Sequence, residues 1–486
     1  MTLGSSLLKT GGRGIWNRHF EFFHEDSVNE RRGSVVKIKG VIGFILLILL
    51  LPGSSWAQGS SDTLTLEESI RIAIERNLAL HSAKEGVIGS EFRRKTARAD
   101  FLPKWTGQYG FTRYSDPITI GSTTTAAAQQ SGQSTANNAT PIVVIPQTTR
   151  DVYNIGSSLV QTLFSGGAIS ANYRFEKLGL ELSKTNVETV KRDIVLQVRV
   201  GYFAIITTEK FVDVGKQAVK QFEAQLEVSK AFFEVGLIPK NDVLQAEVRL
   251  ANARQALVKA ENAVALAKSL FNNLLRREIN TPLEVVDILE YKPFPLIFEE
   301  SLAEALQQRP ELKAADLSVD QAKEAVKVVR SGLFPSVSLS GNYFKTSDEA
   351  YLNGELKSDR WNITALATFT LWEWGKTYYR VGESKVKVTQ AEDAKVQLTE
   401  AITLEVKDDY LNVLVAEKNI EVAQKSIEQA EENLRLNEER YKYQVATATD
   451  VLDAVVLLAQ TRVNYYSALG EFNIAKARLE RAMGRM

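Results

Sequence analysis

The sequence predicts an α+β membrane protein whose protomer is a tandem repeat, with four transmembrane β-strands and long coiled-coil α-helical hairpins. Three observations support this fold class. The chain contains two similar copies of one unit, each copy holds two segments with the periodicity of strands, and each copy ends in helical stretches that are too long for an ordinary globular core.

Two blocks of residues recur at fixed spacings along the chain. The first block recurs 232 positions later without a gap, and the second recurs 208 positions later. Matching pairs are Leu64 and Leu296, Pro103 and Pro335, Tyr202 and Tyr410, Asp242 and Asp450, and Arg254 and Arg462. The change in spacing gives the first copy about 24 extra residues, which we assign to 116–150 because its Thr, Ala, Gln, Ser and Asn are typical of a solvated loop.

The N-terminal part of the chain is predicted to be a secretory signal. Lys37 and Lys39 precede an apolar run at 41–51, and Ser55 and Ala57 are the small residues expected before a cleavage site. Since about 11 apolar residues are far fewer than the roughly 20 of a spanning helix, we favour a signal peptide over a membrane anchor. The predicted organisation is an extension and signal peptide at 1–57, a first structural repeat at 58–281, a proline-containing linker at 282–297 and a second structural repeat at 298–486.

Each copy is expected to open with one helix, at 66–100 in the first copy and at 298–332 in the second. These helices stop before Pro103 and Pro335, because a proline cannot donate the next helical hydrogen bond. A strand pair is expected to follow each helix.

The strands are predicted from an alternation with a period of two. In the second copy, apolar residues alternate with small polar ones over 336–343 and 361–371, as in a sheet with one apolar face. The first copy repeats the pattern over 105–111 and 153–163, less regularly because Val160 and Gln161 interrupt it.

Two helical stretches follow the strands in each copy and are expected to form antiparallel hairpins. The first members, 167–233 and 375–441, would be on the order of 90 to 100 Å long if unbroken. The return helices are predicted at 242–276 and 450–483. Packed coiled coils accommodate helices of this length.

The strand pairs favour a membrane over the alternative of a small sheet on a soluble core. Strands of about 10 residues, with one apolar, aromatic-flanked face and one small polar face, are typical of a transmembrane barrel with a wet lumen. Four strands cannot close a barrel, and open edges in hydrocarbon leave backbone groups unsatisfied. The barrel must therefore form between chains, and three chains, with twelve strands, leave more room for a channel than two.

Over 64–486 the chain resembles the TolC-like outer membrane efflux protein family. The resemblance is carried by the repeat, by LFSGG and LWEWGK after the strand pairs, and by FFEVGLIPKNDVL and RYKYQVATATDVLD at the hairpin tips. It implies a homotrimer with a 12-stranded barrel in the outer membrane lipid of a Gram-negative bacterium and an α-helical barrel in the periplasm. It also implies a periplasmic adaptor protein, an inner-membrane transporter of the RND or ABC type, and service as the exit duct of an efflux pump or a type I secretion system.

The resemblance implies that Asp450 and Asp453 form rings that constrict the periplasmic entrance. For Asp450 the alternative is a helix cap, because Asp242 holds the same place in the first copy and aspartate is favoured at helix starts. Asp453 corresponds to Gln245, so a cap shared by both copies does not account for it.

The resemblance further implies that contacts between the hairpins close this entrance, with Tyr441 as the tyrosine of one contact and Asp242 as its partner. At two other positions this chain differs from the family: Ala446 stands in place of an arginine, and Gln444 stands in place of the glycine of the tip. The residues Val235, Gly236, Leu237 and Ile238 are the candidate surface for docking the adaptor. The alternative is that Leu237 and Ile238 pack the hairpin tip.

The composition gives no support for catalysis or for nucleic-acid binding. The chain has 59 basic and 59 acidic residues, no cysteine and three histidines, of which only His81 lies outside the predicted signal segment. We find no nucleophile elbow, glycine-rich phosphate loop or histidine cluster, and therefore expect neither an enzyme nor a metal or other cofactor. The remaining alternative is a periplasmic coiled-coil scaffold or adaptor without a pore.

Overall fold

The structure is a computed structural model that describes residues 62–119, 148–295, 297–354 and 357–485. The predicted signal peptide and most of the predicted loop at 116–150 lie outside these residues. The two ends of that loop prediction were wrong, because residues up to Thr119 and from Thr148 onward extend strands.

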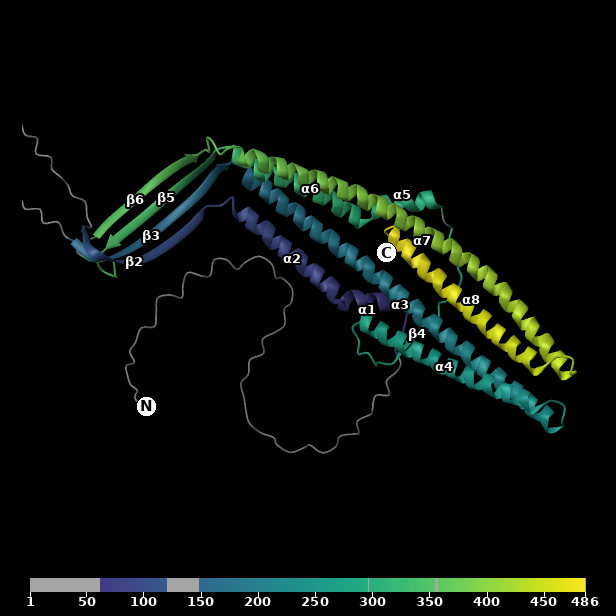
Figure 1. Cartoon of the computed structure of the whole chain (residues 1–486). Coiled ribbons are helices and arrows are strands. Elements are labelled where there is room, and N and C mark those ends of the chain that lie inside the picture. Colours follow the sequence, from purple (N-terminus) through teal and green to yellow (C-terminus); the bar gives the residue numbers. More distant parts are fainter. Residues whose placement is uncertain (1–61, 120–147, 296, 355–356, 486) are drawn as a thin grey trace, which may run out of the picture. The chain divides into compact units, whose positions relative to one another are not determined.

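A four-stranded antiparallel sheet contains the predicted strand pair of each copy (Figure 1). Its order is β2-β3-β5-β6, formed by β2 (Lys104–Thr119), β3 (Thr148–Ser165), β5 (Ser336–Ser347) and β6 (Lys357–Thr368). The strands have 16, 18, 12 and 12 residues, which is longer than the predicted 10 or so. A register shift between Thr162 and Phe164, where β3 faces β5, lies next to the interruption seen in the sequence.

The predicted linker contributes a strand that periodicity could not reveal. β4 (Leu283–Val285) pairs in parallel with β1 (Asp62–Leu64). The hydroxyl of buried Tyr202 lies 3.0 Å from the carbonyl oxygen of Leu64 and 2.9 Å from that of Val286, so its single proton lies between the two strands and can be donated to either carbonyl. Three residues are too few to show an alternation, which is why both strands were missed.

Each opening helix is broken, which corrects the prediction of single helices at 66–100 and 298–332. The first copy has α1 (Leu66–Arg76) and α2 (Leu78–Ala99), and the second has α5 (Phe298–Gln308) and α6 (Pro310–Arg330), followed by the short 3-10 turn η1 (Ser331–Leu333). At the first break the side chain of Asn77 accepts from the backbone N–H groups of Ala79 and Leu80. At the second, Pro310 forces Arg309 into an extended conformation.

The long hairpins agree with the prediction to within two residues at every boundary. α3 (Ala168–Glu234) and α7 (Lys376–Lys442) each have 67 residues, and α4 (Lys240–Leu274) and α8 (Ala448–Ala482) each have 35. α3 packs against α4 and α7 against α8, and α3 also contacts α2, α6 and α8. No helix within the described ranges is long and apolar enough to cross a membrane.

Candidate functional site

The candidate site lies at the two turns that join the hairpin helices. Both turns use one backbone conformation: Gly236 has φ 76° and the corresponding Gln444 has φ 60°. The N–H groups of Leu237 and Val445 donate to carbonyls five residues earlier, each at 2.8 Å. The second turn is therefore as tight as the first although glutamine replaces glycine, at a cost of about 1 kcal/mol for the left-handed residue.

Asp450 belongs to a capping box at the start of α8. Its carboxylate accepts from the backbone N–H and from the hydroxyl of Thr447, both at 2.8 Å, while its own N–H donates to the Thr447 hydroxyl at 3.2 Å. The backbone hydrogen bond from Thr447 is the main reason that the pKa of Asp450 is lowered. The cap itself is Thr447, with Asp450 as the third residue of the capping box, and α4 lacks a side-chain cap at Pro239, so the alternative of one N-cap shared by Asp242 and Asp450 is wrong.

Asp453 forms an ion pair across the two hairpins. Its Oδ1 accepts from Nη2 of Arg249 on α4 at 2.8 Å, and both side chains are exposed. One turn nearer the tip, the hydroxyl of Thr449 donates to Oε1 of Gln245 at 2.9 Å. These links between α4 and α8 were missed by sequence reasoning, and no repeat signal marks Arg249, whose counterpart is Leu457.

Tyr441 is buried in the core of the tips. Its ring packs on Phe232 with centroids 5.3 Å apart, and its hydroxyl lies 3.5 Å from Oγ of Ser229. Asp242 is half-buried near the start of α4. In the described part of a single chain these two residues share no hydrogen bond, so a closing contact between them stays a prediction.

The predicted docking residues separate into two groups. Ile238 packs against the buried cluster of the tips, whereas Val235 and Leu237 are 68% and 52% exposed. The second tip adds Tyr443 and Val445, which are 81% and 66% exposed and were not predicted. Each turn thus presents two exposed apolar side chains, and Gly236 is exposed between the pair of the first tip.

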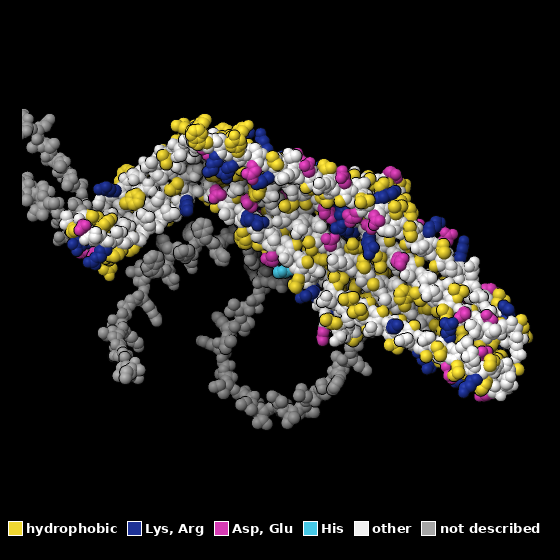
Figure 2. Space-filling view, in the orientation of Figure 1, with side chains coloured by type: hydrophobic (Ala, Val, Ile, Leu, Met, Phe, Trp, Pro, Cys, Tyr) yellow, Lys and Arg dark blue, Asp and Glu magenta, His cyan; other side chains and the backbone are white. Residues whose placement is uncertain are grey.

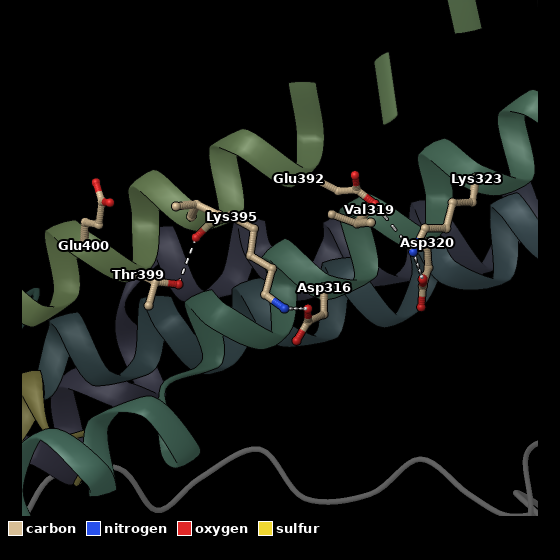
Figure 3. A pocket seen from close by; sticks show the side chains of 9 residues that line it. Asp316, Val319, Asp320, Lys323, Glu392, Lys395, Thr399 and Glu400 are labelled. Atoms are coloured by element: carbon tan, nitrogen blue, oxygen red, sulfur yellow. Dashed lines mark hydrogen bonds and ion pairs between the residues drawn. The ribbon is translucent and has the colours of Figure 1, made fainter. Parts of the chain in front are cut away.

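A groove lies between α6 and α7, away from the hairpin tips (Figure 3). Lys395 pairs with Asp316 at 2.6 Å, and Lys323 lies 3.7 Å from Asp320 and 4.0 Å from Glu392. The two lysines offset only part of the negative charge, because Glu400 also lines the groove and makes four carboxylates in all. Nowhere in the described ranges do three His, Cys, Asp or Glu side chains converge as metal ligands would.

Comparisons with known proteins agree on one family. The family model "Outer membrane efflux protein" matches residues 69–270 and 302–485. Outer membrane protein TolC of Vibrio cholerae is 24% identical over 348 residues, covering 69% of this chain and 77% of its own. Outer membrane efflux protein BepC of Brucella suis is 20% identical over 439 residues, covering 90% and 89%.

Solved structures share the fold at low sequence identity. The Campylobacter jejuni CmeC outer membrane channel superposes with a TM-score of 0.72 at 18% identity, covering 90% of this chain and 94% of that one. The open state of the Neisseria gonorrhoeae MtrE outer membrane channel gives 0.70 at 20% identity, covering 86% and 89%.

Proposed function

Because the chain belongs to the outer membrane efflux protein family, we propose that it is the exit duct of a tripartite efflux pump or of a type I secretion system. The family resides in the outer membrane of Gram-negative bacteria, and its fold is that of channels. The duct conducts its substrates passively and catalyses no reaction. An inner-membrane transporter of the RND or ABC type and a periplasmic adaptor supply the cargo.

The open four-stranded sheet carries this proposal. Its edges are β2 and β6, and the register places Trp105 and Trp361, which are 78% and 75% exposed, on the same face of the sheet. In a bilayer the free edges would leave N–H and C=O groups unsatisfied, at several kcal/mol each. Pairing β6 of one chain with β2 of the next closes a barrel, and three chains make twelve strands.

The carboxylates at the hairpin tips act as an entrance filter in this proposal. Asp450 and Asp453, repeated in three chains, place negative charge around the narrow end, where it attracts cations and repels anions. Tyr441 and Asp242 contribute to closure between elements that meet in the trimer. Val235, Gly236, Leu237 and Ile238 form the adaptor surface, with Ile238 supporting the exposed pair from below.

The ion pair on Asp453 allows a test of charge that leaves the fold intact. Exposed pairs stabilise proteins by only about 0 to 1 kcal/mol, so Asp453→Asn and Arg249→Gln should fold normally. Asp450→Asn keeps an acceptor for the Thr447 N–H while removing the charge. Asp393→Asn on α7 is the matched control, since Asp393 is exposed and far along the helix from the tip.

The measurement is single-channel conductance and ion selectivity of the purified protein in planar bilayers. Wild type should show a small, cation-selective conductance. Cation selectivity should fall in Asp450→Asn and Asp453→Asn, rise in Arg249→Gln and stay unchanged in Asp393→Asn. A protein that inserts and conducts with the same selectivity in all variants contradicts the filter, whereas one that opens no channel and stays in the periplasm contradicts the duct and favours the scaffold.

A further inference from the structure

The segment after β6 and the first turn of α7 together carry four aromatic side chains that are largely exposed. Trp372, Trp374, Tyr378 and Tyr379, here called the aromatic collar, are 73%, 84%, 72% and 71% exposed. The two tryptophans form one T-shaped pair with ring centroids 5.7 Å apart, and the two tyrosines form another at 5.6 Å. Figure 2 shows hydrophobic side chains gathered there with Lys and Arg beside them.

The backbone at Trp374 shows that this exposure has a cost. Trp374 and Gly375 have φ 54° and 78°, and the corresponding Gly166 and Gly167 of the first copy have φ 62° and 86°. Both copies therefore need two left-handed residues in succession, a conformation that glycine adopts freely and tryptophan does not. The second copy places a large ring where the first has glycine, although the ring gains little packing within the chain.

Two exposed cations, Lys376 and Arg380, adjoin the collar; the charge of Glu373 acts on both of them, and that of Glu383 acts on Arg380 as well. Lys387, further along α7, pairs with Glu383 at 2.8 Å. Lys376 and Arg380 form no ion pair within the described part of the chain, and both are exposed. The nearest carboxylate in sequence, that of Glu373, accepts from the backbone N–H of Thr377 at 2.8 Å.

The neighbouring chain is a poor partner for these cations. In the proposed barrel, β2 of the next chain lies beside β6 and begins at Lys104, just after Arg98 at the end of α2. Both residues are exposed and cationic. The exposed carboxylate of Asp100 lies between these two residues in sequence, so the stretch from Arg98 to Lys104 adds a net charge of only +1 near Lys376 and Arg380.

We propose that the aromatic collar, with Lys376 and Arg380, binds the headgroups of anionic phospholipids in the leaflet nearest the helices. This rests on the proposed channel, because it requires the sheet to lie in a bilayer. Tryptophan and tyrosine place an apolar ring among acyl chains and a polar tip among headgroups. The two cations complement lipid phosphates, and the collar is continuous in sequence with the exposed apolar side chains that end β6, among them Phe369 and Leu371.

The test uses tryptophan fluorescence in reconstituted vesicles. Of the six tryptophans, Trp16 and Trp56 lie in the predicted signal segment, so a Trp105→Phe, Trp361→Phe background leaves only the two collar rings in the mature chain. Vesicles contain brominated phosphatidylglycerol or brominated phosphatidylcholine at equal fractions. Each cation near an anionic surface adds roughly a fivefold preference for anionic over zwitterionic lipid. Brominated phosphatidylglycerol should therefore quench the tryptophan fluorescence at a several-fold lower lipid fraction than brominated phosphatidylcholine does.

Matched variants separate charge from simple membrane contact. Lys376→Gln with Arg380→Gln should make the two lipids quench equally, whereas Lys442→Gln at the far end of α7 should leave the preference intact. Channel conductance is recorded from the same vesicles. If the protein conducts but neither lipid quenches its tryptophan fluorescence, the collar packs against a neighbouring chain and the proposal is refuted. Equal quenching by both lipids in wild type would refute the headgroup site. Loss of conductance in every sample would instead refute the channel.

Discussion

Replacing Arg309 by methionine tests a charged cluster that joins the break between α5 and α6 to α7 and α8. The Arg309 side chain is 4% exposed and donates two hydrogen bonds to Glu311, of 3.0 and 3.2 Å. Its third nitrogen donates to Glu405. Arg481 lies 3.0 Å from Glu311 and 3.1 Å from Glu405. Both carboxylates therefore have two cations each.

Removing one partner of a buried ion pair costs about 3 to 5 kcal/mol. Here Arg481 remains beside both carboxylates and Glu405 is partly exposed, so we expect Arg309→Met to lower the free energy of unfolding by about 2 to 3 kcal/mol. Guanidinium chloride titration in mild detergent, followed by helical circular dichroism, measures the change. The double variant Arg309→Met with Glu311→Leu should recover part of the loss, because an apolar pair leaves less charge unpaired.

A loss below about 0.5 kcal/mol in the single variant, or a greater loss in the double variant, would refute this electrostatic account. In the first case the cluster would behave like exposed ion pairs. In the second, packing of the long side chains around the break would be the dominant contribution.

Three further predictions follow from local geometry. Burial, followed by the charges of Glu405 and Asp408, raises the pKa of Asp409 to about 6. The protonated side chain therefore favours the folded state below the pKa of the unfolded chain, and this stabilisation is lost as the pH rises through 6. In the same titration, Asp409→Asn should be more stable than wild type by about 1 kcal/mol at pH 8 and equally stable at pH 4. Asp450→Ala should lose about 1 kcal/mol of capping and speed amide hydrogen exchange at the start of α8, whereas Asp242→Ala should not affect α4. Gly166→Ala should lower the melting temperature by several degrees because the new Cβ would lie 2.5 Å from the carbonyl oxygen of Ser331, whereas Trp374→Ala, with the same backbone, should change it little in detergent.

Periodicity and chain punctuation were enough to predict the sheet and the hairpins. The 67-residue helices contain no proline, and Pro103 and Pro335 stand directly before the strands, so local sequence determines where these elements begin and end. The helix break at Arg309 carried a signal that was overlooked: Pro310 disfavours helical backbone at the preceding residue.

The cross-hairpin contacts could not be predicted in the same way. Arg249 and Asp453 are 204 positions apart, and their meeting depends on how α4 and α8 are rotated about their axes in the folded chain. Tyr441 shows the same limit: its identity matched a family position, but its burial against Phe232 follows from packing between hairpins. Side-chain partners across repeats follow from tertiary packing, which a one-dimensional pattern does not contain.

The two hairpin turns allow a prediction in which each copy serves as the control for the other. Gly236 and Gln444 share the left-handed conformation and the same closing hydrogen bonds, so the backbone demand is equal and only the side chain differs. Gln444→Gly should relieve about 1 kcal/mol of local strain, and Gly236→Gln should introduce it. Amide exchange at Val445 should slow in the first variant, and exchange at Leu237 should accelerate in the second, by up to about fivefold in each case. Changes of the same sign at both turns would mean that contacts of the Gln444 side chain, and not its backbone conformation, govern the second tip.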